Sequence, residues 1–365
     1  MRRRRVADAG GHGGPVNARA TPPRIAIVGA GSLIGEVVRE RIEAGALPCT
    51  SLVLLEAAGS PGRVAARDDD PGRDAAAPEA SIGDVDAYDF GESDLVFFCA
   101  HAATATRYAA AAARTAWVID GTHAHRDRAD VALVAADVNP HALDGIELHG
   151  LVALPGSASA ALATALAPLQ GLAGLERVDV ATYHAVSGAG RAGIDGLAAD
   201  TIALLSGKSA RKRPFGAQIA FNVLPLVGAL DEHGVSDEER RLADETRRLL
   251  GAPGLAINAT AVRVPVFFGH GLAVHLQLAR AFELADAIEA LKRGPGLRWV
   301  DSTAGEPGPT PASTALEPDH VEVGRVRIDA SRDRSLNFWV VADNVRKCAA
   351  HNAVSVAQIL VNKAR

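Results

Sequence analysis

Short apolar runs alternate with amphipathic or Ala-rich stretches through the first 150 residues of this chain. The run at residues 25–28 is typical of a buried parallel strand, and a glycine-rich turn and an amphipathic stretch at 36–44 follow it. Further strand-like runs occur at 51–55, 94–98 and 116–120, with an Ala-rich helical segment at 104–114. Strands that alternate with helices predict a doubly wound, Rossmann-like parallel sheet in an α/β fold.

The pattern changes after residue 150. Strand-like runs at 178–183, 259–268, 274–282 and 325–329 predict a second, largely antiparallel sheet that carries helices. A helix is predicted over 236–250, because Ser236 and Glu239 have the spacing of a capping box. A long amphipathic helix is predicted over 345–362, after a cap at Asp343-Asn344.

Two segments show no such periodicity. Residues 1–23 are rich in Arg, Gly and Ala and are predicted to form a disordered tail. Their run of arginines resembles the start of a signal peptide, but no apolar stretch follows, so we do not expect export. Residues 68–80 are rich in Asp, Ala and Pro, which predicts a surface loop.

Composition and charge exclude several classes of protein. A chain of 365 residues with net charge −5 has room for two domains but no basic field for nucleic acid. It has no uninterrupted apolar run of roughly 18 residues, so no membrane span is expected. Cys49, Cys99 and Cys348 are too sparse for a disulfide framework, which favours a reducing, cytoplasmic location. Paired metal-ligand spacings are missing, and no metal site is predicted.

The glycine-rich turn after the first strand is the first candidate for a binding site. It reads Gly29-Ala30-Gly31-Ser32-Leu33-Ile34-Gly35, with the spacing GxGxxxG. Such a turn lets backbone N–H groups and a helix N-terminus approach a pyrophosphate. A tight strand-to-helix turn that packs on its own sheet also requires glycines, so the motif alone leaves both interpretations open.

A set of modest motifs, in order from residue 24 to 365, resembles the aspartate-β-semialdehyde dehydrogenase family. They are Ala-Ile-Val-Gly-Ala (26–30), Val-Ile-Asp (118–120), Asp-Val-Asn (137–139), Ala-Val-Ser-Gly-Ala-Gly-Arg-Ala-Gly (185–193), Phe-Asn-Val-Leu-Pro (221–225), Arg-Val-Pro-Val (263–266), Gly-His (269–270) and Asp-Asn-Val-Arg-Lys (343–347).

The resemblance implies a domain organisation and a reaction. It implies an NAD(P)-binding Rossmann-like domain at 24–150, an α+β catalytic and dimerisation domain at 151–340, and a C-terminal helix at 341–365 that returns to the first domain. It also implies a homodimer that uses NAD or NADP. In the family, a cysteine attacks the aldehyde, hydride passes to NADP, and phosphate cleaves the acyl-thioester.

The resemblance also implies site residues. His270 matches the acid/base histidine, Arg263 the carboxylate-binding arginine, and Arg126 the phosphate-binding arginine, while Glu238 and Arg241 match substrate-binding and phosphate-binding groups. Structural ion pairs are the alternative for these charged residues. The implied cofactor-binding residues are Gly29, Gly31, Ser32, Leu33, Ile34, Gly35, Glu56, Ser187, Gly188 and Asn344.

The departures from the family pattern fall at the nucleophile and at the cofactor. Ser157 stands where the resemblance leads one to expect the nucleophilic cysteine, and His184 where the family has a glutamine. The arginine that grips the NADP 2′-phosphate is missing after the second strand. Glu56 at that strand's end is suited to a ribose 2′-OH, which favours NAD over NADP.

Three functions therefore stay open. The first is a diverged paralogue, like the cysteine-less Usg-type members, that keeps the fold and a small anionic ligand but not the reaction. The second is an active NAD(P)-dependent semialdehyde dehydrogenase with an altered mechanism, in which Cys99 or Cys348 is a minor candidate nucleophile. The third is a hydrolase that uses Ser157 and His270, although no GxSxG elbow is present.

Overall fold

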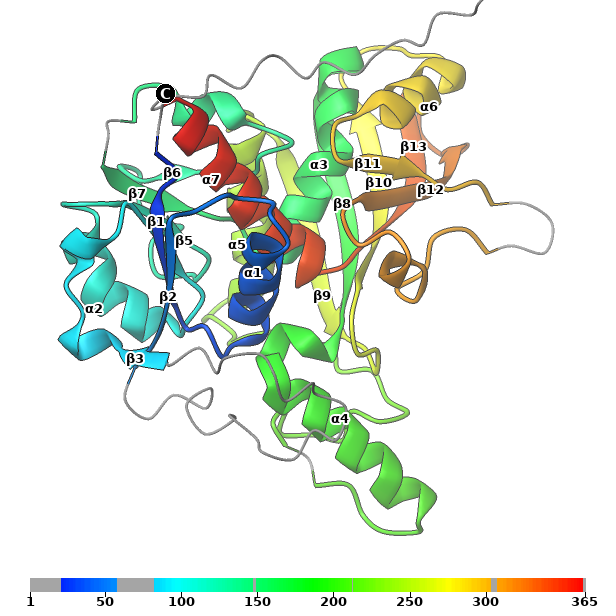
Figure 1. Ribbon diagram of the computed structural model, residues 1–365. Helices are drawn as coiled ribbons and strands as arrows, with labels where there is room; N and C mark the ends of the chain where they lie inside the picture. Colours follow the sequence, from blue (N-terminus) through cyan, green and yellow to red (C-terminus); the bar gives the residue numbers. More distant parts are fainter. Residues whose placement is uncertain (1–20, 58–81, 147–148, 212, 303–306, 364–365) are drawn as a thin grey trace, which may run out of the picture.

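The computed structural model describes residues 21–57, 82–146, 149–211, 213–302 and 307–363 (Figure 1). The loop predicted at 68–80 lies outside the described residues, and so does the predicted tail apart from residues 21–23, which form neither helix nor strand. Two sheets stand side by side, one built from residues 24–153 and the other from 175–342. The domain boundaries at 150 and 340 stay predictions.

The first sheet is parallel throughout, as the sequence pattern predicts. Its strand order is β3-β2-β1-β4-β5-β7-β6. The strands are β1 (Arg24–Val28), β2 (Ser51–Glu56), β3 (Ile82–Asp84), β4 (Leu95–Phe98), β5 (Trp117–Asp120), β6 (Ala132–Leu133) and β7 (Gly150–Ala153).

Helices cover both faces of this sheet. Alternate residues of a strand point to opposite faces, so Ile25 and Ile27 pack against α1 (Leu33–Glu43), whereas Ala26 and Val28 share a core with α2 (Ala102–Ala112). The doubly wound, Rossmann-like arrangement is therefore confirmed.

The second sheet is mixed, with the order β11-β12-β13-β10-β8-β9. Its central pairs are antiparallel, as expected, whereas β9 and β11 run parallel to their neighbours. The strands are β8 (Leu175–His184), β9 (Ala256–Arg263), β10 (His270–Leu278), β11 (Leu297–Trp299), β12 (Val321–Ile328) and β13 (Ser335–Ala342). Helices α3 (Ser157–Ala173) and α6 (Leu284–Arg293) contribute to the core on one face of the sheet.

Some element predictions need correction. The strands predicted at 259–268 and 274–282 are shifted, because the chain leaves the sheet at 264–269 through Pro265 and Gly269, whose φ is +89°. The apolar pattern does not reveal α3, α4 (Gly190–Leu205), α6 or β13. Helix α3 escapes notice because it is Ala-rich and buried around much of its circumference, so it has little amphipathic period.

Two helix predictions from local signals are confirmed. Helix α5 (Asp237–Leu249) begins with the expected capping box between Ser236 and Glu239. The C-terminal segment forms a π-helical turn (Arg346–His351) followed by α7 (Asn352–Lys363). None of the helices within the described ranges has both the length and the apolar character that a membrane crossing requires.

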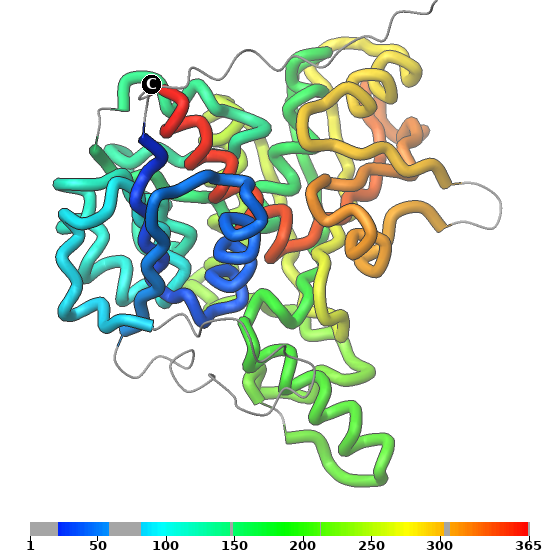
Figure 2. Tube along the Cα trace, viewed as in Figure 1, coloured from blue at the N-terminus to red at the C-terminus, as the bar shows by residue number. Residues whose placement is uncertain are grey.

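The C-terminal helix returns to the first sheet, as predicted. Figure 2 shows this segment, in red, beside the blue segment that carries β1 and α1. Val356, Ala357 and Leu360 are buried in the core that α1 shares with the first sheet. The side chain of Asn352 accepts a hydrogen bond from Ala136 N–H and donates one to the carbonyl of Val134. The segment therefore closes the fold over the junction of the two sheets.

Candidate active site

A cavity of about 650 Å³ lies where the two sheets meet. Loops at the carboxyl ends of β1, β4 and β5 form one side of it, and segments that follow β7, β8 and β13 form the other. The predicted site residues that line it are Gly29, Gly31, Ser32, Leu33, Ile34, Glu56, Arg126, Ser157, His184, Ser187, Gly188, Glu238, Arg241, Arg263, His270 and Asn344. Of the predicted site residues, Gly35 is the one that does not line the cavity.

Close packing requires the glycines of this turn, and the turn also leaves two backbone N–H groups without acceptors in the described part of the chain. A Cβ at Gly29, whose φ is +85°, would lie 2.5 Å from Ala100 N, and one at Gly35 would lie 2.2 Å from the carbonyl oxygen of Gly29. Ser32 caps α1 by accepting from Gly35 N–H. Among the described residues, no acceptor satisfies the Leu33 and Ile34 amides, and both residues line the cavity. The turn therefore fits an anionic group such as a pyrophosphate.

Glu56 contacts the glycine turn through a hydrogen bond with Gly31. Its side chain is buried at the end of β2, and Oε1 accepts a hydrogen bond of 2.6 Å from Gly31 N–H. The carboxylate thus lies at the end of the second strand and contacts the glycine turn, where it would face the adenosine half of a bound dinucleotide.

His270 and His184 form a buried aromatic pair. Their ring centroids are 4.6 Å apart, and both side chains are almost fully buried. Burial holds the pKa of His270 well below its usual value, and the neighbouring His184 and Arg263 act in the same direction. Burial and then Arg263 lower the pKa of His184 to about 3. Both rings are therefore neutral near neutral pH.

The hydrogen bond of His270 defines its tautomer. Nδ1 accepts from Ala185 N–H at 3.1 Å, so the neutral ring carries its proton on Nε2. That nitrogen lies near Gly188, where a Cβ would be 3.7 Å away. Nε2 is thus a proton donor in this arrangement rather than an acceptor.

Arg263 and Glu238 bring opposite charges to the floor of the cavity. Arg263 is 9% exposed, donates to the carbonyl of Ala185 and lies over the ring of Phe215. Burial lowers its pKa, although a guanidinium stays charged in proteins. Burial, followed by the charge of Glu245, raises the pKa of Glu238. The pair can hold a ligand that carries both a carboxylate and an amine.

Arg126 is held in position by hydrogen bonds to two backbone carbonyl groups. Its Nε donates to the carbonyl of Leu154 at 2.7 Å and its Nη2 to that of Gly121 at 3.1 Å. Its Nη1 lies 3.7 Å from the buried carboxylate of Glu245, whose other oxygen accepts from Gly156 N–H at 2.6 Å. Glu245 therefore connects α5 to the beginning of α3.

Arg241 differs from the other arginines because its partner is on its own helix. It pairs with Asp237 four residues earlier, not with Glu238 three residues earlier. The side chain still lines the cavity. Its ion pair is of the kind expected on a helix surface, so its charge is partly engaged.

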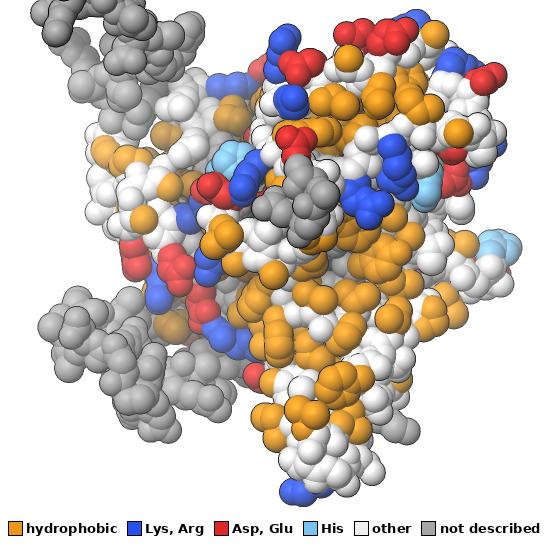
Figure 3. Space-filling view, turned by 90° about the vertical axis from the view of Figure 1, so that its right-hand side faces the viewer, with side chains coloured by type: hydrophobic (Ala, Val, Ile, Leu, Met, Phe, Trp, Pro, Cys, Tyr) orange, Lys and Arg blue, Asp and Glu red, His pale blue; other side chains and the backbone are white. Residues whose placement is uncertain are grey.

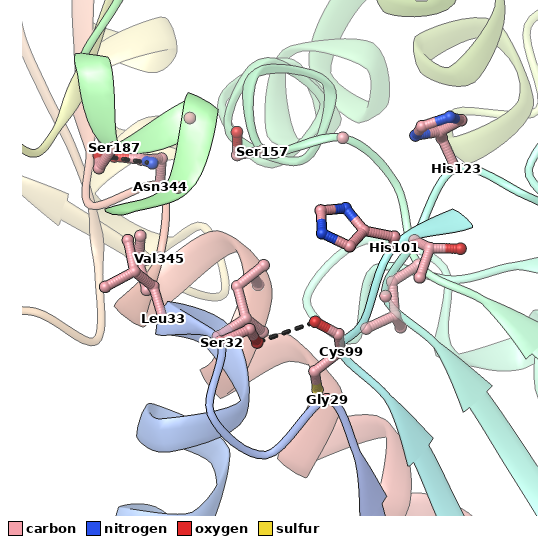
Figure 4. Close-up of a pocket in the computed structure, with 18 of the residues that line it drawn as sticks. Gly29, Ser32, Leu33, Cys99, His101, His123, Ser157, Ser187, Asn344 and Val345 are labelled. Atoms are coloured by element: carbon pink, nitrogen blue, oxygen red, sulfur yellow. Dashed lines mark hydrogen bonds between the residues drawn. The ribbon is translucent and has the colours of Figure 1, made fainter. Parts of the chain in front are cut away.

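Ser157 is the first residue of α3 and lines the cavity (Figure 4). Within the described residues, its hydroxyl makes no hydrogen bond, and none joins it to a histidine. Since His270 Nε2 is a donor, the geometry lacks the serine-to-base contact that a hydrolase needs.

Ser187 and Asn344 connect the segments that follow β8 and β13. Asn344 Nδ2 donates to Ser187 Oγ at 3.0 Å (Figure 4). Its Oδ1 accepts from Gly269 N–H at 3.1 Å. On the opposite wall, Ser32 donates to the carbonyl of Cys99. These contacts fix the segments that form two walls of the cavity.

Sequence reasoning missed several residues of this site. Glu245 is one, although it lies two turns after Glu238 on the same face of α5, a spacing that would have pointed to it. His101 and His123 also line the cavity (Figure 4). The buried Asp120–His125 pair, with 2.7 Å between Oδ2 and Nδ1, supports the loop of Arg126 and has no signal in the sequence.

The other candidate nucleophiles, Cys99 and Cys348, are buried thiols, and Cys99 lines the cavity. Burial raises the pKa of the Cys99 thiol and of the Cys348 thiol to about 12. A protonated, buried thiol is a poor nucleophile near neutral pH. Neither cysteine therefore offers a substitute for a reactive thiol at position 157.

The parallel sheet with its glycine turn, together with the mixed sheet that completes the cavity, defines a dinucleotide-binding α/β protein. Residues 24–146 match the NAD-binding domain of semialdehyde dehydrogenases, and residues 166–347 match their dimerisation domain. The chain belongs to the aspartate-semialdehyde dehydrogenase family.

Individual relatives agree with this assignment. The chain is 35% identical to the aspartate-semialdehyde dehydrogenase of Shewanella violacea, over 92% of this chain and 97% of the relative. It is 36% identical to a USG-1 protein homolog of Azotobacter vinelandii, over 93% and 98%. The crystal structure of aspartate semialdehyde dehydrogenase II from Vibrio cholerae superposes with a TM-score of 0.84 at 34% identity, covering 93% of this chain and 99% of that one.

Proposed function

We propose that this protein is a diverged family member that binds a small anionic ligand and a dinucleotide but has lost the phosphorylating dehydrogenase reaction. The observation that carries the proposal is Ser157 at the beginning of α3, inside a cavity that still holds His270, Arg263 and Arg126. A serine hydroxyl ionises far less readily than a thiol, and His270 Nε2 is not placed to accept its proton.

The remaining residues have assignable roles in binding. Arg263 and Glu238 hold the charged groups of an amino-acid-like ligand, and Arg126 holds a second anion. The Leu33 and Ile34 amides at α1 face the pyrophosphate of a dinucleotide, which when bound supplies a hydride acceptor. His270 keeps a proton on Nε2 and can donate it to an oxygen of the ligand.

The test is phosphate-dependent reduction of NAD and of NADP by aspartate semialdehyde, with purified wild-type protein. We expect no turnover above the background without protein. Turnover by the wild type would overturn the proposal and favour the alternative of an active dehydrogenase with an altered mechanism. Ester hydrolysis that disappears in Ser157→Ala would instead support the hydrolase.

The dinucleotide preference gives a separate prediction. We expect wild-type protein to bind NAD at least about 10-fold tighter than NADP, because the buried carboxylate of Glu56 would repel a 2′-phosphate. In Glu56→Gln the preference should shrink to about threefold, because glutamine removes the charge but keeps an acceptor for Gly31 N–H. Isothermal titration with both dinucleotides measures this, and equal affinities in the wild type would contradict the role of Glu56.

The homodimer predicted from the sequence has a candidate surface in the segment that matches the dimerisation domain. Large hydrophobic side chains are exposed there, namely Ile202, Leu205, Phe221, Val223, Leu230, Phe267 and Phe268. Figure 3 shows a face on which hydrophobic side chains gather and continue down to the projection that carries α4. A second copy that covers these residues would remove their apolar area from water. A cytoplasmic location stays a prediction from the sparse cysteines.

A further inference from the structure

One ion pair lies beside the cavity, and its arginine is among the lining residues. Arg191, the second residue of α4, pairs with Glu36 in the first turn of α1. The two side chains are 46% and 35% exposed, so water and ligands can reach both. The pair connects the glycine-turn side of the cavity to the side formed by the second sheet's segments. Nothing in the family match assigns it a role.

The position of Glu36 brings Arg191 close to the free amides of α1. Side chains on a helix tilt towards its N-terminus, so the Glu36 carboxylate reaches back over the first turn. That turn carries the Leu33 and Ile34 N–H groups that lack acceptors within the described residues. Arg191, Leu33 and Ile34 line the same cavity, so one anionic ligand there can meet both the guanidinium and the amides.

The other arginines of the described cavity lining have contacts of their own, and we assign Arg126 and Arg263 to the small anionic ligand. Arg126 donates to two carbonyls, Arg241 pairs with Asp237, and Arg263 is buried over an aromatic ring. Ala57, the described residue that follows β2, is not an arginine. Among these arginines, Arg191 is the one that adjoins the glycine turn and has an exposed, exchangeable partner.

We propose that Arg191 binds the pyrophosphate of the dinucleotide, and that Glu36 holds its guanidinium in place until the pyrophosphate displaces the carboxylate. This inference rests on the proposed dinucleotide site. Two charge-assisted hydrogen bonds from a planar guanidinium suit a diphosphate, whereas the exposed ion pair that they replace is weak. Glu36 therefore lowers the affinity for a dinucleotide while it positions the arginine.

The test compares dissociation constants for NAD, ADP-ribose and adenosine by isothermal titration. Arg191→Gln should weaken NAD and ADP-ribose by about 10-fold and adenosine by less than about twofold, because adenosine has no phosphate. Glu36→Gln should tighten ADP-ribose by about threefold, and this gain should vanish in the Arg191→Gln background. Arg39→Gln, which removes an arginine paired with Glu43 on the same helix, is the matched control and should change little.

Three outcomes would overturn the inference. They are unchanged ADP-ribose binding in Arg191→Gln, a Glu36→Gln gain that persists without Arg191, and a wild-type protein that binds neither NAD nor ADP-ribose. ADP-ribose has no nicotinamide and cannot accept a hydride, so its dissociation constants do not depend on catalytic activity. Turnover by the wild type would overturn the proposal that the reaction is lost, but it would not affect the proposed role of Arg191. Failure of one proposal can therefore be distinguished from failure of the other.

Discussion

The Ser157→Cys variant will carry a thiol that reacts with iodoacetamide about 100-fold faster than Cys99 or Cys348 near neutral pH. Position 157 begins the 17-residue helix α3, and the N-terminus of a helix stabilises a thiolate. The Cys99 and Cys348 thiols are buried, with pKa values of about 12, so they stay protonated. Peptide mass spectrometry over the time course gives the rate for each thiol.

A cysteine at the opposite end of a helix provides the matched control. Ser206 is exposed at the C-cap of α4, where the helix dipole disfavours a thiolate. The pH dependence of labelling should have its midpoint below about 8.5 for Ser157→Cys and above it for Ser206→Cys. A midpoint for the first variant at or above that of the second would contradict the activating effect of α3.

The same variant should gain dehydrogenase turnover. Phosphate-dependent reduction of NAD by aspartate semialdehyde should rise to at least about 10³-fold above the background rate without protein, because the nucleophile carries most of the covalent chemistry. His270, Arg263 and Arg126 already surround the position. A variant with a reactive thiol but no turnover would show that the site has been remodelled beyond its nucleophile, with His184 the next residue to exchange.

Gly35→Ala should reduce the free energy of unfolding by roughly 3 kcal/mol. A Cβ there would lie 2.2 Å from the carbonyl oxygen of Gly29 and 2.9 Å from Ala30 Cα, so α1 must move away from the turn. Both neighbours are backbone atoms that cannot rotate aside. Urea unfolding followed by circular dichroism measures the loss, and dinucleotide affinity should fall with it because the turn is displaced.

Gly171→Ala is the control with the opposite sign. Gly171 lies in α3, and a Cβ there would meet nothing within 4 Å. Alanine in a helix interior is favoured over glycine by about 0.5–1 kcal/mol, so this variant should be slightly more stable than wild type. Equal effects from the two substitutions would refute the steric argument for Gly35.

The family resemblance supplied most of the candidate site residues. The sequence pattern itself predicted the parallel sheet, the glycine turn and the capping box of α5. These depend on local patterns: apolar runs, a glycine turn and a Ser-to-Glu spacing are readable because they act within a few residues. Helix α3 was not predicted because it lacks such a local pattern. Its residues are apolar around most of the helix, and only the packing of both sheets on it distinguishes it from a buried strand.

The tertiary structure alone decided how the candidate residues act. Glu56 meets Gly31 across 25 residues, Glu245 meets Gly156 across 89, and Asn344 meets Ser187 across 157. No local pattern encodes such contacts, because they arise only when segments far apart in the sequence pack together. The low pKa of His270 and the ion pair of Arg191 with Glu36 have the same origin, since burial and charge proximity are properties of the folded chain.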